Sequence, residues 1–201
     1  NGKKISKSLG NIIDPIEVTD KYGVDVLRYF LLREIPPGQD GDFNEKSLTA
    51  RLNNELANDL GNLVSRVISM IIKYFDGKVP DGNKDNDLVN DLNERFKKAD
   101  ESINNFEIDR SLEEVWGFIR SCNKYVNDKK PWESNKKEDI LYNLYEGLRC
   151  ISILLSSFIP ETTEKINHQL GLKQCGSFKD LKFGKVKGKV VKGNLLFKKI
   201  E

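Results

Sequence analysis

The sequence of 201 residues lacks any long apolar run and any secretory leader. No apolar stretch approaches the roughly 18–20 residues that a membrane span requires, and the lysine-rich opening has no apolar core of the signal-peptide kind. We therefore expect no membrane partner. An excess of charge is also missing, because 33 Lys and Arg face 31 Asp and Glu. Any contact with nucleic acid must then be local rather than the effect of an overall positive field.

Cysteine pairs and metal ligands are scarce as well. Cys122, Cys150 and Cys175 form no C-x-x-C pair, and their odd number leaves at least one thiol unpaired. Reduced thiols in a cytoplasmic protein are the expected state. His168 is the single histidine and has no cysteine pair beside it, so we predict no metal site in this chain.

The apolar pattern that is present predicts a mainly α-helical fold. Pro15 is suited to the first position of a short helix, and a second helix starts at Asp25 and ends before Pro36. One amphipathic helix of about 30 residues is predicted from the N-cap residue Asn44 to Asp76. Its apolar residues recur at steps of three and four: Leu48, Leu52, Leu56, Leu60, Leu63, Val67 and Ile71.

Four further helices are expected downstream, and an irregular tail follows them. The helices cover about 88–103, 111–126, 137–157 and 160–171. Ser111 and Glu114 fit a capping box at the start of one helix, and Trp116 lies in its buried stripe. The tail is rich in glycine and lysine and cannot form its own core. We predict that it packs back on the body through Leu195, Leu196 and Phe197.

The first candidate functional motif is a lysine pair near the beginning of the sequence. Lys4 and Lys7 flank Ile5-Ser6 between two glycines. Such a flexible cationic loop can stabilise the negative charge on a transferred phosphoryl group or a departing pyrophosphate. Its glycine spacing differs from that of the G-x-x-x-x-G-K-[ST] phosphate loop. The alternative interpretation is a solvated chain terminus.

A polar row on the long helix is the second candidate. Asp59, Asn62, Arg66 and Ser69 lie beside the apolar stripe, and Asn62 and Arg66 are four residues apart, so they point in nearly the same direction. An amide next to a guanidinium with five donors is suited to hydrogen bonding the edge of a nucleobase. An ordinary solvated helix face is the alternative.

Trp132 is the third candidate. It follows Pro131 at a break between two helices, where an indole offers a stacking face to a base. The alternative is a tryptophan that closes the end of the bundle core.

In their order along the chain, these motifs resemble the C-terminal part of the methionyl-tRNA synthetases, a family of class I aminoacyl-tRNA synthetases. The segment 2–11 with Asp14-Pro15 is similar to the K-M-S-K-S signature, with Ile5 in place of the commoner Met. The segment 22–32 resembles the stem-contact segment that follows this loop. Asp40-Gly41-Asp42-Phe43 before the long helix narrows the resemblance to the methionyl enzymes.

The resemblance implies a fold and a division of the chain. It implies a stem-contact module with the lysine loop over 1–37, an anticodon-binding helix bundle over 38–172 and a C-terminal strap over 173–201. The Rossmann-type catalytic domain with its H-I-G-H signature and the methionine pocket would lie upstream of Asn1. The chain alone is therefore expected to bind no cofactor and to be inactive.

The resemblance also implies an activity for the full-length enzyme: methionine–tRNA ligase, which charges tRNA(Met) with methionine through methionyl-adenylate. Lys4 and Lys7 would be catalytic, and Lys4, Ser6, Lys7 and Ser8 would bind ATP, which carries Mg²⁺. A cytoplasmic location follows from this activity.

The same resemblance places Asn62, Arg66 and Trp132 where the family reads the CAU anticodon. The anticodon loop and inner stem of tRNA(Met) would be the partner. Two alternatives stay open: another class I synthetase, of the leucyl, isoleucyl, valyl or cysteinyl kind, and a stand-alone helical RNA-binding or scaffold protein.

Overall fold

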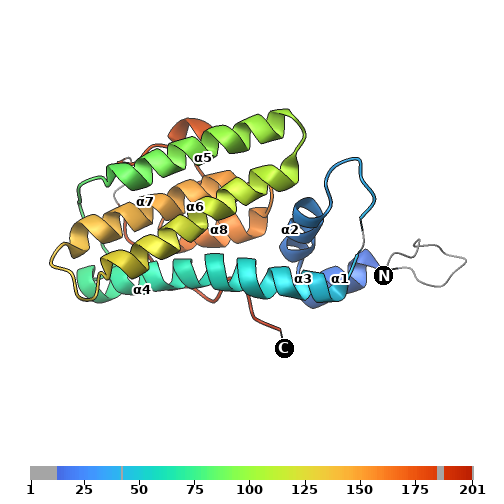
Figure 1. Cartoon of the computed structure of the whole chain (residues 1–201). Helices are drawn as coiled ribbons and strands as arrows, with labels where there is room; N and C mark the ends of the chain where they lie inside the picture. The colour runs from blue at the N-terminus through green and yellow to red at the C-terminus, as the bar shows by residue number, and fades with distance from the viewer. Residues whose placement is uncertain (1–12, 42, 185–187, 201) are drawn as a thin grey trace, which may run out of the picture.

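The computed structural model describes residues 13–41, 43–184 and 188–200. Throughout this part the chain is helical, and its β pairing is limited to one isolated antiparallel bridge between Lys78 and Lys189. No helix in the described ranges is both long and apolar enough to span a bilayer. The small N-terminal module lies at one end and the bundle at the other, with one long helix running along both (Figure 1).

The N-terminal module consists of α1 (Pro15–Tyr22) and α2 (Val24–Glu34). Pro15 occupies the first helical position as predicted, and the Asp14 carboxylate caps the helix by accepting from the Ile16 amide at 2.8 Å. Between the two helices Gly23 has φ 93°, which favours glycine. In α2, the side chains of Tyr29 and Phe30 are fully buried against the rest of the protein.

The long helix begins and ends where the sequence predicts. Asn44 accepts from the amides of Lys46 and Ser47, and Asp76 ends the helix in the left-handed conformation at φ 51°. Within these limits there are three segments: α3 (Glu45–Arg51), the π-helix η2 (Leu52–Gly61) and α4 (Asn62–Phe75). The wider turn is visible where the Asn62 amide bonds to the Ala57 carbonyl, five residues back.

The π segment follows from the spacing of the leucines. Leu48, Leu52, Leu56 and Leu60 are separated by three steps of four residues, and each step overshoots a 3.6-residue turn by ~40°. In a regular α-helix this drift would turn the last leucine well away from the first. All four are nevertheless buried, because the wider π turn takes up the extra residues.

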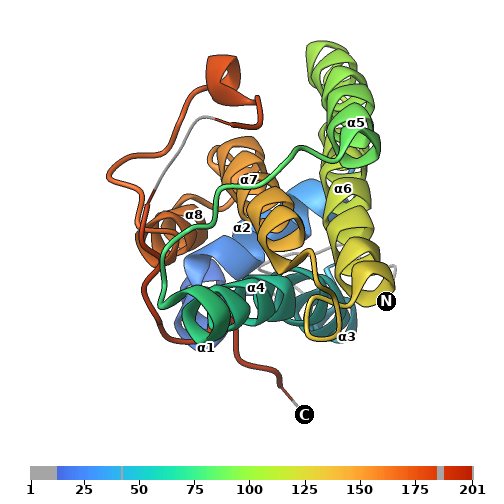
Figure 2. The ribbon, with the colours of Figure 1, turned by 90° about the vertical axis from the view of Figure 1, so that its left-hand side faces the viewer.

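The bundle is built from α5 (Asn86–Asn104), α6 (Ile108–Lys129), α7 (Lys137–Leu155) and α8 (Pro160–Gln169). Figure 2 shows α7 surrounded by α4, α6 and α8. Every residue from Ile140 to Leu155 is accordingly buried, including polar ones, so α7 is the core element of the bundle.

The predicted capping box at Ser111 is wrong. Helix α6 begins one turn earlier, at Ile108, and Ser111 lies inside it with its amide bonded to the Glu107 carbonyl at 3.0 Å. The chain reverses instead at Phe106, whose φ is 60°, and Ile108 already packs on the core. Trp116 in the same helix is fully buried, as predicted.

The tail packs back on the body as a strap, as Figure 2 shows along α8. Leu196 and Phe197 contact the core as predicted, but Leu195 is 72% exposed, so this part of the prediction is wrong. The strap bends at Leu196, which directs Leu196 and Phe197 together toward the body and leaves Leu195 outside the contact. The described part of the strap also contributes three buried side chains: Leu181, Phe183 and Val190.

Candidate nucleic-acid interface

The predicted nucleotide-binding residues Lys4, Ser6, Lys7 and Ser8 lie outside the described residues. The structure therefore places the other predicted set: Asn62, Arg66 and Trp132.

Arg66 is directed toward the last turn of α6. It is half-buried, and its Nη2 donates to Asn127 Oδ1 at 2.9 Å. This contact uses one of the five donors of the guanidinium. Asn127 lies five residues before Trp132, so the bond joins α4 to the segment that carries the candidate stacking residue.

Asn62 is exposed and forms its hydrogen bond to a residue that sequence reasoning missed. Its Nδ2 donates to Asn58 Oδ1 at 3.3 Å. Asn58, Asn62 and Arg66 are spaced at steps of four, a signal that was present in the sequence. The predicted row included Asp59, three residues before Asn62, and left out Asn58, four residues before it.

Asp59 lies in the seam between η2 and α6 rather than on the polar row. Its backbone carbonyl accepts from Asn123 Nδ2 at 2.9 Å. Partial burial raises the pKa of the Asp59 carboxyl above its ordinary value, with the nearby Arg120 opposing the shift. Asn123 and Asn127 are thus two side chains of α6, four residues apart, that hold the long helix from the other side of the seam.

Trp132 stands on a tight turn at the end of the bundle. Lys130 ends α6 in the left-handed conformation at φ 44°, Pro131 is buried, and the indole is 44% exposed. Its Nε1 donates to Glu133 Oε1 at 3.1 Å. A side chain exposed to this degree does not close the bundle core, whereas it can receive a stacked ring.

Two lysines flank an aromatic ring at this end of the bundle. The ammonium groups of Lys73 and Lys137 lie 5.2 Å and 5.7 Å from the ring centre of Tyr74. Lys137 also donates to the Ser134 carbonyl at 2.8 Å, which fixes it to the turn that carries Trp132. The end of α4 and the α6–α7 turn lie together in both views (Figures 1 and 2). Exposed aromatic surface beside cations is typical of a surface that binds single-stranded nucleic acid.

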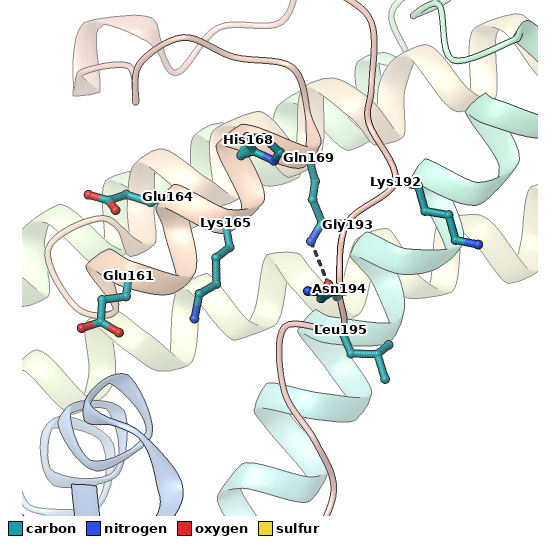
Figure 3. A pocket seen from close by; sticks show the side chains of 9 residues that line it. All are labelled: Glu161, Glu164, Lys165, His168, Gln169, Lys192, Gly193, Asn194 and Leu195. Atoms are coloured by element: carbon teal, nitrogen blue, oxygen red, sulfur yellow. Dashed lines mark hydrogen bonds between the residues drawn. The ribbon is translucent and has the colours of Figure 1, made fainter. Parts of the chain in front are cut away.

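A hollow with a volume of about 1020 Å³ lies elsewhere, between α8 and the strap (Figure 3). Across it, Gln169 Nε2 donates to the Asn194 carbonyl at 3.0 Å. None of the three predicted anticodon residues lines it. Its walls are formed by Glu161, Glu164, Lys165, His168, Gln169, Lys192, Gly193, Asn194 and Leu195.

The described residues contain no group of three or more histidine, cysteine or acidic side chains that could hold a metal ion.

Two family models match the chain. Residues 1–68 match the model of the class I tRNA synthetases of type M, and residues 85–189, more than half of the chain, match the anticodon-binding domain of tRNA ligases.

Relatives and solved structures give the same result. The chain is 43% identical to a methionine–tRNA ligase of Caldanaerobacter subterraneus and 42% identical to one of Clostridium tetani; each alignment covers all of this chain and 34% and 33% of the relative. It thus spans about a third of the length of these curated relatives. Methionyl-tRNA synthetase of Mycobacterium tuberculosis with methionyl-adenylate superposes with a TM-score of 0.89 at 32% identity, over 98% of this chain and 42% of that one.

Proposed function

Because the chain belongs to the methionyl-tRNA synthetases, of which it represents the end of the catalytic domain and the anticodon-binding domain, we propose that it reads the anticodon of tRNA(Met). Membership in this family sets aside the leucyl, isoleucyl, valyl and cysteinyl enzymes, as well as a stand-alone RNA-binding protein. The division into residues 1–37, 38–172 and 173–201 remains part of the proposal.

The exposure of the Trp132 indole is the observation that supports the proposal most directly. The exposed indole is held on a turn five residues after Asn127, to which Arg66 donates, so we expect a base stacked on the indole to lie within reach of polar side chains from α4. In the proposed complex Trp132 stacks on an anticodon base, and Asn62 and Arg66 hydrogen-bond base edges. Asn58 orients the Asn62 amide through their hydrogen bond.

In the full-length enzyme we propose that the chain also contributes to ATP-dependent charging. A carboxylate oxygen of methionine attacks the α-phosphorus of ATP, and the bond to the bridging oxygen breaks with its electron pair leaving on pyrophosphate. Lys4 and Lys7 would stabilise the charge that builds up on that leaving group, with Ser6 and Ser8 beside them at the triphosphate. Mg²⁺ enters the proposal only as the usual counter-ion of the triphosphate.

One kinetic experiment with two variants of a full-length synthetase that contains this chain tests both roles. Trp132→Ala should lower kcat/KM for tRNA charging by about 5- to 150-fold, the equivalent of one lost stacking contact, and leave pyrophosphate exchange unchanged. Lys7→Ala should lower pyrophosphate exchange by about 100-fold or more. An equal loss in both reactions for Trp132→Ala would indicate a structural tryptophan, and near-normal exchange for Lys7→Ala would exclude the role of the lysine loop.

A further inference from the structure

Helix α2 presents two opposite charges, one turn apart, to the junction of α7 and α8. Asp25 is 5% exposed, and its Oδ2 accepts from the Thr162 amide at 2.6 Å in the first turn of α8. Arg28 donates from Nη2 to the Ser157 carbonyl at 2.9 Å and from Nε to the Phe158 carbonyl at 3.0 Å, just beyond the end of α7. We call Asp25 and Arg28 the α2 clamp.

The charges of the clamp match the helix ends that they contact. The N-terminus of a helix carries free amides and a partial positive charge, and its C-terminus carries free carbonyls and a partial negative charge. The residue before α8, Ile159, provides no side-chain cap, so Asp25 supplies the missing acceptor from another helix. Arg28 supplies donors to the carbonyls at the opposite end of the same junction. Hydrogen bonds of this charge-assisted kind are stronger and more directional than neutral ones.

The junction held by the clamp is one end of a rigid rod. Helix α7 has 19 residues and therefore rises ~28 Å, and it is buried from Ile140 to Leu155. At its other end, Lys137 is tied to the turn that carries Trp132. The clamp itself lies in α2, which follows α1 and the lysine loop along the chain. A fixed element therefore connects the proposed anticodon reader to the module that follows the proposed ATP-binding residues along the chain.

We propose that Asp25 and Arg28 are positioning residues that set the orientation of the anticodon reader relative to the catalytic part of the enzyme. This inference rests on the proposed function. A tRNA bound at Trp132 brings its distant acceptor end to the adenylate only if the bundle is held at one fixed angle relative to the catalytic part. Neither clamp residue touches tRNA or ATP in this account, because both act through the backbone of the α7–α8 junction.

Three measurements on a full-length synthetase that contains this chain separate positioning from the other roles. They are pyrophosphate exchange, affinity for an isolated CAU stem-loop, and charging of intact tRNA. For Asp25→Ala and Arg28→Ala, exchange and stem-loop affinity should stay within twofold of the parent. The kcat for charging should fall at least tenfold, because both ends of the tRNA must be engaged at once. Asp25→Asn keeps an acceptor oxygen, so its kcat for charging should fall less than that of Asp25→Ala.

Two exposed positions provide matched controls. Asp20→Asn in α1 and Arg110→Ala in α6 should leave all three measurements unchanged. The inference is overturned if charging by the clamp variants stays normal, or if exchange, stem-loop affinity and charging all fall together, which would indicate a merely structural role. If Asp25→Ala does not fold, the same comparison rests on Asp25→Asn and Arg28→Ala. A parent enzyme that binds CAU and scrambled stem-loops equally would contradict the proposed anticodon function instead, whatever the clamp variants do.

Discussion

Exposure separates the two tryptophans of this chain. Trp116 is fully buried with its ring 4.4 Å from that of Tyr29, and its indole N–H has no partner within the described residues. Trp132 is 44% exposed and has only a bond to its neighbour Glu133. The first is committed to packing, whereas the second is free to bind a ligand. Replacement of Trp132 should therefore affect function more than stability.

The three thiols should differ in reactivity in the same way. Burial raises the pKa of Cys122 above its ordinary value and that of Cys150 to about 12. A raised thiol pKa means that both stay protonated, and therefore unreactive, at pH 8. Cys175 is exposed. Iodoacetamide at pH 8 should thus modify one cysteine in the folded protein and three after unfolding, as counted by mass spectrometry.

Cys175→Ser is the control for this labelling, because it should leave the folded protein unmodified. Fast alkylation of Cys122 or Cys150 in the native state would contradict the burial that the structure gives these residues.

Single site residues could be predicted only where the sequence pattern itself carries them. Asn62, Arg66 and Trp132 were identified from helix spacing, a proline-tryptophan break and family resemblance. Asn127 and Asn123 could not be, because their importance is a contact between two helices more than 50 residues apart in sequence. Asn58 could have been identified, because it lies four residues before Asn62, the same spacing that separates Asn62 from Arg66.

At the scale of elements, the length of the long helix was predictable but its winding was not deduced. The caps at Asn44 and Asp76 are local signals and were found. The spacing of four residues between successive leucines was also visible. Interpreting it as a wider turn requires knowing that all these leucines face one core. Ser111 shows the converse case, in which a correct local motif yields to the tertiary packing of Ile108.

Asn53 in the π segment forms two hydrogen bonds to the end of the strap. Asn53 donates from Nδ2 to the Ile200 carbonyl at 2.7 Å and accepts from the Ile200 amide at 3.0 Å. Asn53→Ala removes both bonds and should cost about 1–3 kcal/mol locally. The expected result is faster tryptic cleavage at Lys198 and Lys199, with a small change in the global unfolding midpoint.

Asn54→Ala is the matched control for this element, because Asn54 is the exposed neighbour in the same helix. Equal cleavage rates for the two variants would show that the Asn53 clasp does not hold the strap.

At the scale of the whole molecule, α2 connects the N-terminal module to the bundle through more than the clamp. Tyr29 donates to the Glu55 carboxylate, and burial together with that carboxylate raises the pKa of the tyrosine, so it remains a donor. Arg33 pairs with Glu113 of α6 and lies 3.8 Å from Glu55. These polar groups lie in the same seam as Asp59, Asn123 and Arg66. One face of the long helix therefore contacts α6 along the seam, from the N-terminal module to the proposed anticodon reader.

This arrangement was only partly accessible to sequence reasoning. The helices and their order followed from periodicity and from resemblance to the family. The orientation of the module on the bundle depends on paired polar side chains from distant segments, such as Asp25 with the Thr162 amide, and no single segment contains that information.

The most direct test of the account is the affinity of this chain for an anticodon stem-loop with CAU and for one with a scrambled triplet, at about 100 mM monovalent salt. The CAU loop should bind at least tenfold more tightly, and Trp132→Ala should lose most of that preference. Equal affinity for the two loops, or an undiminished preference in Trp132→Ala, would contradict the account.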